Sequence, residues 1–355
     1  MQIKIYIIPK KRRKIMMKLL SWEYARNIIR DTTPSLRYKE GEDFSLWQKR
    51  CREKLSELLC LGNIKRAEDD KFTVEYVKEE ADFTEYRFTL QSEEGYTFPA
   101  VMRVPKGKKA PMPLIITLQG HSTGMHISIG KPIYPKDEES INSGDRDFVV
   151  RAVKEGYVAV AIEQRNFGEV GYKEGDYTVN RCHMESMNAI ISGRTTIGER
   201  VTDVRCTIDA VLREFDFIDK EKIVLMGNSG GGTATLYAAA LDERIALAMP
   251  SCAVCTYKDS IAAMPHCVCN FVPNIANYFD MGDIGGLIAP RKLIVVNGKE
   301  DDIFPEAGVL EAYSEIERLY RVAGVPENVA LVTGDGGHRF YADDSWPTVH
   351  KMMGV

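Results

Sequence analysis

One serine of the chain stands in a turn whose residue types suit nucleophilic catalysis. Ser229 is flanked by Gly227 and Gly231 in the pattern Gly-x-Ser-x-Gly. An apolar run at 223–226 precedes the turn and a helix-like segment at 233–240 follows it, which is the context of a nucleophile elbow. The glycines leave the room that a strained serine backbone needs. The pattern predicts that Ser229 is a nucleophile; the alternative is a glycine-rich turn without chemistry.

Three adjacent carboxylates follow a later apolar run and could supply the acid of a catalytic triad. A serine nucleophile needs a base and an acid that orients the base. After a nucleophile elbow these come in the order acid, then histidine. The run at 293–296 leads into Glu300, Asp301 and Asp302. We expect Asp301 to be the acid, with Asp302 as the alternative, and the remaining carboxylates to cap the following helix.

His338 is the histidine best placed to act as the base. It follows the apolar run at 329–332 in a glycine-rich loop, and it comes after the acid in the chain. Glycines before a histidine allow the loop to bring the imidazole over the serine. His350 lies in the predicted terminal helix, and we interpret it as a surface residue.

Two backbone amides are predicted to form the oxyanion hole. Gly230 begins the helix after Ser229, where the helix dipole and a free N–H favour a developing negative charge. His121 lies in the loop after the apolar run at 114–118, which supplies the second donor in sites of this kind. Its side chain could contact the substrate or only shape the loop. The residues predicted to bind substrate are Gln119, His121, Cys252, His266 and Phe304.

Two long segments are predicted to form the walls of a pocket. Residues 120–146 and 251–290 follow apolar runs where shorter connections would suffice, and long loops in compact domains are usually functional. Open α/β sheets bind ligands at the carboxyl ends of their strands, where both segments begin. Arg165 lies in the turn after the run at 158–162, and we expect it to pin that turn rather than bind substrate.

The elements that must position these residues alternate regularly from residue 113 onward. Short apolar runs, typical of strands buried on both faces, are separated by amphipathic helical segments such as 199–215 and 306–322. This order predicts a doubly wound, mostly parallel α/β sheet. Residues 71–105 alternate as antiparallel strands, and 17–66 have helical periodicity. We therefore expect an N-terminal extension with packed helices at 1–70 and a catalytic domain at 71–355.

The composition is that of a globular protein without a nucleic-acid partner. The chain has 355 residues, 44% of them hydrophobic, and a net charge of −4. The charged residues of the first 20 positions are all basic, but no apolar core of signal-peptide length follows them. We interpret them as an extension, with a nucleic-acid or membrane arm as the alternative. No run approaches the roughly 20 apolar residues of a membrane span. We expect a cytoplasmic protein; the sequence gives no indication of its oligomeric state.

The eight cysteines are interpreted as reduced, packed thiols. Cys252 and Cys255, followed by Cys267 and Cys269, form a pattern that could bind zinc. The second pair has one intervening residue, whereas structural zinc sites usually have two to four. We therefore expect no metal site.

These segments resemble the α/β-hydrolase superfamily. More narrowly, residues 71–350 are similar to the bacterial dienelactone-hydrolase and acetyl-xylan-esterase-like hydrolases. The resemblance depends on four segments: 219–231, 289–293, 298–305 and 337–340. It implies hydrolysis of carboxylic esters through an acyl-enzyme, without a metal or organic cofactor. The better-known deacetylases of this group carry Gln after the serine and Glu after the histidine, where this chain has Gly230 and Arg339. Their Arg-Gly-Gln-Gly turn is replaced by the sequence at 165–168.

The function expected from the sequence is that of a serine esterase acting on a small-molecule or oligosaccharide ester, such as an acetylated xylan fragment. A competing function is that of a peptidase of the prolyl-oligopeptidase type. Such enzymes usually carry a propeller or a similar gating domain, and no repeat of about 40–50 residues is visible. A binding protein on the same scaffold is a third possibility, and a thiol or metal protein built on the cysteines is a fourth.

Overall fold

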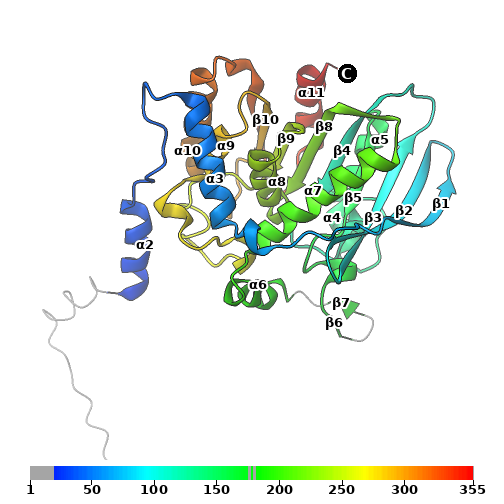
Figure 1. Cartoon of the computed structure of the whole chain (residues 1–355), viewed down its shortest axis with the longest axis horizontal. Coiled ribbons are helices and arrows are strands. Elements are labelled where there is room, and N and C mark those ends of the chain that lie inside the picture. Colours follow the sequence, from blue (N-terminus) through cyan, green and yellow to red (C-terminus); the bar gives the residue numbers. More distant parts are fainter. Residues whose placement is uncertain (1–19, 175–176, 179–180, 355) are drawn as a thin grey trace, which may run out of the picture.

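The computed structural model describes residues 20–174, 177–178 and 181–354 (Figure 1). The basic residues of the N-terminal segment lie outside this range. Within it, nine strands form one sheet in the order β1-β2-β3-β5-β4-β8-β9-β10-β11. The strands of the main sheet are β1 (Thr73–Glu79), β2 (Phe83–Glu93), β3 (Tyr96–Pro105), β4 (Met112–Leu118), β5 (Val158–Ile162), β8 (Ile218–Asn228), β9 (Ile245–Ser251), β10 (Lys292–Gly298) and β11 (Val329–Gly334). The short strands β6 (Lys173–Glu174) and β7 (Tyr177–Thr178) form a separate ribbon.

The sheet has an antiparallel beginning and a parallel remainder. Strands β1, β2 and β3 pair antiparallel in succession, and β3 pairs antiparallel with β5. From β5 through β4, β8, β9 and β10 to β11, every neighbouring pair is parallel. The predicted α/β fold with a mostly parallel sheet is therefore confirmed. All strands that precede the predicted catalytic residues end at the same edge of this sheet.

Helices cover both faces of the sheet, which explains why the strands are continuous apolar runs. Leu225 of β8 packs in a core that also contains residues of α3, α7, α8, α9 and α10, whereas its neighbours Val224 and Met226 pack in a second core with α5 and α11. Successive residues of a strand point to opposite faces, so both faces require apolar side chains. The helices are α2 (Ser21–Asp31), α3 (Phe44–Leu58), α4 (Asp137–Gly144), α5 (Phe148–Lys154), α6 (Cys182–Ile191), α7 (Thr196–Glu214), α8 (Gly230–Leu241), α9 (Met281–Gly286), α10 (Glu306–Val322) and α11 (Ala342–Met353).

The N-terminal helices are not detached from the main fold. The predicted helical region consists of α2 and α3 with irregular chain at 32–43 between them. Trp47 of α3 is fully buried in the first core, and its indole N–H donates to the Leu36 carbonyl at 2.7 Å. The side-chain amide of Gln48 donates to the Ala289 carbonyl at 2.6 Å. Helix α3 thus packs on the domain that carries the predicted site (Figure 1).

The helices of the described residues differ in length and hydropathy from a membrane span. None of them is both long enough and apolar enough to cross a bilayer.

The two predicted wall segments contain structure of their own. Residues 120–146 include α4, and residues 251–290 include α9 and two short 3₁₀ turns at Val268–Asn270 and Ile275–Asn277.

Candidate active site

Ser229 lies in a sharp turn between β8 and α8. Its backbone has φ 56° and ψ −123°, a region that residues with a side chain rarely adopt. A Cβ atom on Gly227 would lie 2.4 Å from the Gly231 carbonyl oxygen, and one on Gly231 would lie 2.2 Å from the Leu118 carbonyl oxygen. Both glycines are therefore required by close backbone approaches. The turn has the geometry of a nucleophile elbow.

Two backbone N–H groups near Ser229 have no acceptor among the described residues. The Ser229 N–H itself donates to the Ser251 carbonyl at 2.8 Å, so it is not available. Within the described residues, no hydrogen bond uses the N–H of Gly230, the first residue of α8, or that of His121. The loop that carries His121 touches the turn, because a Cβ atom on Gly120 would lie 2.9 Å from Ser229 Cβ. This is the arrangement that an oxyanion hole requires.

Asp301 and His338 form a hydrogen-bonded pair at the ends of β10 and β11. His338 Nδ1 lies 2.8 Å from Asp301 Oδ2, and Asp301 Oδ1 accepts from the N–H groups of Ile303 at 2.8 Å and Phe304 at 3.0 Å. Burial alone would raise the pKa of Asp301, but the hydrogen bonds and the neighbouring imidazole hold it below its ordinary value. Asp302 is exposed and makes no contact with His338. Asp301 is the carboxylate that orients the imidazole.

Ser229 and the Asp301–His338 pair lie at the same edge of the sheet, with β9 between the strand that carries Ser229 and the strands that carry the pair. Ser251 of β9 accepts from the Ser229 N–H, and the next residue, Cys252, donates from its own N–H to the Val296 carbonyl of β10 at 2.8 Å. Within the described residues, no hydrogen bond joins Ser229 Oγ to His338 Nε2. Such contacts are often long in free enzymes and shorten when substrate binds. Because Asp301 holds Nδ1, Nε2 is the ring nitrogen left to accept a proton.

Phe304 packs on the imidazole, and His266 packs on Phe304. The Phe304 ring stacks on His338 with centroids 5.9 Å apart and an interplanar angle of 13°, and the His266 ring meets Phe304 edge-on at 5.5 Å. Burial and the nearby His338 lower the pKa of His266. Of these two residues predicted to bind substrate, Phe304 contacts the predicted base but is buried, and His266 reaches it through Phe304.

Gln119 and Cys252, also predicted to bind substrate, are buried. Gln119 donates from its side-chain amide to Ser128 Oγ at 2.7 Å and to the Arg146 carbonyl at 2.8 Å. Cys252 is 1% exposed, and its thiol donates to the Arg339 carbonyl at 3.1 Å. Burial and the Asp301 carboxylate raise the pKa of Cys252 to about 12. Both side chains hold the loops around the site together, and neither lies on an open surface.

Buried polar side chains fix the two loops beside the serine. Arg165 is bidentate to Asp203, with contacts of 2.8 and 2.9 Å, so it pins its turn as expected. Glu163 accepts from the N–H groups of Met125 at 3.0 Å and Glu169 at 3.1 Å. Burial raises the pKa of Glu163 to about 8. Glu163 thereby joins the loop after β4 to the turn after β5.

The cysteines group differently from the sequence interpretation. Cys252 lies with Asp301 and His338, and Cys255 packs against Gly308, so these two do not form a cluster with Cys267 and Cys269. The latter pair instead meets two residues that the sequence did not connect with it, Cys182 of α6 and His121. No spacing in the sequence indicates this group, because three separate segments contribute to it.

Two groups of side chains in the described residues are compact enough to hold a metal ion. One comprises Cys252, Asp301 and His338, and the other His121, Cys182, Cys267 and Cys269. The side chains of the first group already have partners, since Asp301 binds His338 and the Cys252 thiol donates to the Arg339 carbonyl. In the second, hydrogen bonds with Cys267 and Cys269 lower the pKa of the Cys182 thiol, although burial opposes them.

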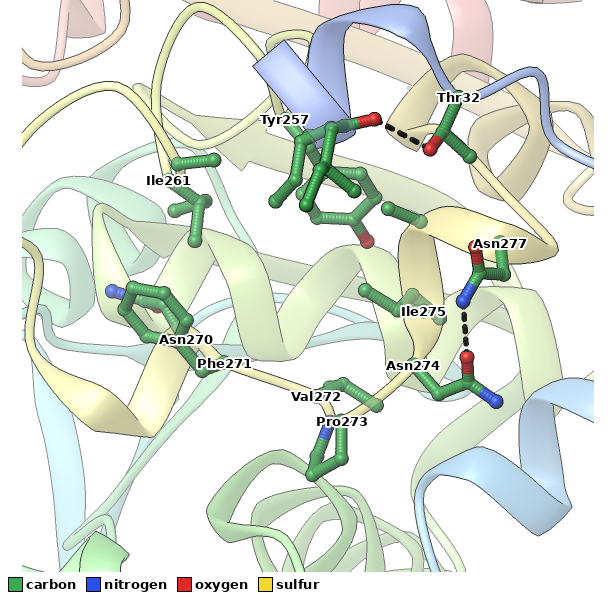
Figure 2. Close-up of a pocket in the computed structure, with 14 residues that line it drawn as sticks. Thr32, Tyr257, Ile261, Asn270, Phe271, Val272, Pro273, Asn274, Ile275 and Asn277 are labelled. Carbon is green, nitrogen blue, oxygen red and sulfur yellow. Dashed lines mark hydrogen bonds between the residues drawn. The ribbon is translucent and has the colours of Figure 1, made fainter. Parts of the chain in front are cut away.

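An apolar hollow of about 310 Å³ lies away from these residues, between α2 and the segment 257–277 (Figure 2). Tyr257, Ile261, Val272 and Ile275 line it, together with Ile28 and Ile29 of α2. Neither Ser229 nor the Asp301–His338 pair lines this hollow. Part of the predicted wall segment 251–290 therefore surrounds a space that Ser229 does not line.

Comparisons with known proteins agree with the geometry. The sequence model of the abhydrolase family matches residues 13–345. YtaP of Bacillus subtilis (strain 168), which is named for a suspected hydrolase activity, is 25% identical over 246 residues, covering 68% of this chain and 77% of YtaP.

Solved structures share the fold. A protein from Bacteroides fragilis NCTC 9343, assigned as an acetyl xylan esterase, superposes with a TM-score of 0.75 at 19% identity, covering 88% of this chain and 82% of that one. A glucuronoyl esterase from Solibacter usitatus superposes with a TM-score of 0.65 at 15% identity, covering 91% and 97%.

Proposed function

The chain belongs to the abhydrolase family, and on this basis we propose that it is a serine esterase that hydrolyses carboxylic esters through an acyl-enzyme. The observation that carries the proposal is the strained Ser229 at the end of β8, followed by the unused N–H of Gly230, with a His338 ring held by Asp301 at the same edge of the sheet. A strained backbone persists only where the surrounding structure imposes it, and such strain concentrates at functional sites.

In the proposed mechanism, each residue has one task. His338 Nε2 accepts the proton of Ser229 as its oxygen attacks the ester carbonyl. Asp301 keeps the proton on Nδ1 and stabilises the imidazolium that forms. The N–H groups of Gly230 and His121 bind the oxyanion, and the dipole of α8 adds to their effect. His338 passes the proton that it took from Ser229 to the departing alkoxide as the ester C–O bond breaks, which leaves the acyl-enzyme. A water then gives a proton to His338 as it attacks the acyl carbonyl, and His338 returns that proton to Ser229 as the acid is released.

The proposed substrate class is a carbohydrate-linked ester. The support is that the similar solved structures include proteins named as acetyl xylan and glucuronoyl esterases. Phe304 is buried beneath the His338 ring, and the partly buried His266 packs on it, so His266 is the residue that we propose to contact the sugar or the acyl group. We further propose that acetyl groups on oligosaccharides, such as xylan fragments, are the esters cleaved.

The test compares Ser229→Ala with Ser345→Ala as a matched control. Ser345 is fully buried in α11, and its hydroxyl has no partner within the described residues, so its removal should leave activity unchanged. We expect Ser229→Ala to abolish hydrolysis of p-nitrophenyl acetate and covalent labelling by a fluorophosphonate, with an unchanged melting temperature. Retained hydrolysis or labelling in Ser229→Ala would show that Ser229 is not the nucleophile.

Substrate class is tested separately, with acetylated xylo-oligosaccharides and with p-nitrophenyl esters of increasing acyl length. A kcat/KM for the acetylated oligosaccharides above that for the simple acetate supports the carbohydrate assignment. Equal or lower values, together with a preference for longer acyl chains, would contradict it while leaving the esterase proposal intact.

A further inference from the structure

Four soft metal-binding atoms converge beside the oxyanion loop. The ligand atoms of His121, Cys182, Cys267 and Cys269 all lie within 4.8 Å of one another. His121 comes from the loop after β4, Cys182 is the first residue of α6, and the remaining two flank the start of the 3₁₀ turn Val268–Asn270. The cluster is largely enclosed, since Cys182 and Cys269 are buried and His121 and Cys267 are partly buried.

The spacing fits a tetrahedral ion. Bonds of about 2.3 Å to sulfur and about 2.0 Å to nitrogen place ligand atoms roughly 3.6–3.8 Å apart in a tetrahedron. Cys269 Sγ lies 3.4 Å from His121 Nε2, and no pair of ligand atoms exceeds 4.8 Å. The side chains would have to contract by about 1 Å at most to bind the ion. Because the ligands come from the folded positions of three segments, the short Cys267–Cys269 spacing does not prevent this arrangement.

A buried cation beside the cluster supplies an independent argument from charge. Arg200 of α7 is 2% exposed, and its guanidinium donates to Cys182 Sγ at 3.5 Å. Within the described residues, no carboxylate pairs with Arg200, and its Nε has no hydrogen-bond partner. A buried charge without a counter-charge is strongly destabilising. The ionisable groups that act most strongly on Arg200 are the thiols of Cys269, Cys182 and Cys267.

The charge of a metal complex would balance this arginine. Zn²⁺ bound by three thiolates and one neutral imidazole carries a net charge of −1, which offsets the +1 of Arg200. Three protonated thiols supply no negative charge. A disulfide between two of them removes two potential thiolates and leaves only the third to compensate Arg200. Tetrahedral sulfur and nitrogen ligation is the set that zinc prefers.

We propose that His121, Cys182, Cys267 and Cys269 form a Cys₃His zinc site. Four protein ligands leave no open position, so the site is structural rather than catalytic. A hydrogen bond from Asn166 Nδ2 to Cys182 Sγ at 3.8 Å and the guanidinium of Arg200 surround the thiolates, as outer ligands of metal sites commonly do.

The proposed ion also has a consequence for the neighbouring chemistry, which rests on the proposed function. The His121 ring lies against Gly230, because a Cβ atom there would be 3.4 Å from it. Zinc would therefore tie the loop that carries one oxyanion N–H to α6 and to the 251–290 segment. His121 acts here as a positioning residue through the ion.

The experiment measures metal content in the full chain purified without chelators. We expect one zinc ion per chain in the wild type by mass spectrometry of the metals, and almost none in Cys182→Ser and Cys269→Ser. Cys255→Ser is the matched control, because Cys255 is also buried and lies in the same wall segment but outside the cluster; it should retain one zinc. Loss of zinc in the control as well would contradict the assignment of ligands.

A second measurement needs no substitution. After chelation, the wild-type protein should bind one equivalent of Co²⁺ with a thiolate-to-cobalt charge-transfer band, and its melting temperature should rise by several degrees. Wild-type protein that contains no zinc and takes up no Co²⁺ would overturn the proposal. So would a disulfide among Cys182, Cys267 and Cys269 in intact-mass analysis. Ser229→Ala should retain its zinc, so the metal site and the esterase proposal can fail independently.

Discussion

Replacement of Asp301 by asparagine is the substitution whose effect can be worked out most fully from the structure. Asparagine has the same shape, and its carbonyl oxygen can still accept from the N–H groups of Ile303 and Phe304. Its NH₂ group then faces His338 Nδ1 in place of Asp301 Oδ2. Because both would be donors, His338 must move its proton to Nε2. In that tautomer, Nε2 cannot accept the proton of the serine.

The expected loss is large for catalysis and small for folding. Fixing the wrong tautomer in a Ser-His-Asp triad lowers kcat by about 10⁴-fold, which corresponds to about 5.4 kcal/mol of transition-state stabilisation. The turn bonds to the backbone are kept, so the free energy of unfolding should change by only about 1–2 kcal/mol.

The assay is steady-state hydrolysis of p-nitrophenyl acetate together with thermal unfolding. Asp302→Asn is the matched control: this neighbour is exposed, and its kcat should stay within about twofold of wild type. Titration with a fluorophosphonate should also be slowed in Asp301→Asn, because it requires the same proton transfer. Activity of Asp301→Asn within tenfold of wild type, or a larger loss in Asp302→Asn, would refute the assignment of the acid.

Two further predictions concern stability. Burial raises the pKa of Glu163 to about 8 from an ordinary 4.5, so between these pH values the folded state keeps a proton that the unfolded state releases. The contribution of Glu163 to the free energy of unfolding therefore falls as pH rises from about 4.5 to 8. We expect a flatter pH dependence of this free energy in Glu163→Gln than in wild type, and parallel curves would contradict the reasoning. Trp47→Ala should lower the free energy of unfolding by about 3–5 kcal/mol, because Trp47 lies in the main core. In chemical denaturation the variant should still unfold in one transition. An unchanged midpoint would mean that α3 does not contribute to that core.

Most of the architecture can be predicted from the sequence because it depends on patterns of residues that are close together in the chain. Apolar runs of strand length, such as 223–226, predict strands because each strand must supply apolar side chains to a core on both faces of the sheet. The elbow around Ser229 is predictable because only glycine fits at Gly227 and Gly231. The order of serine, acid and histidine then follows from the order of the strands. The helical prediction for the N-terminal region was less complete, since the irregular chain at 32–43 separates α2 from α3.

Only the tertiary structure could choose among chemically equivalent neighbours. Asp301 and Asp302 have the same side chain and adjacent positions, and the backbone of the turn decides which of them is buried against His338. For the same reason, Cys252 and Cys267 belong to different clusters although the sequence suggested one.

The sequence by itself determined the sheet, the elbow and the side chains from which a triad could be drawn, because each depends on residues close together in the chain. The tertiary structure alone brought Cys182 and Arg200 to His121 and the Cys267–Cys269 pair. The closeness of these residues depends on how α6, α7 and two long loops pack over the strand ends. No spacing of residues in the sequence predicts this packing, because the contacts join segments that are remote in the chain.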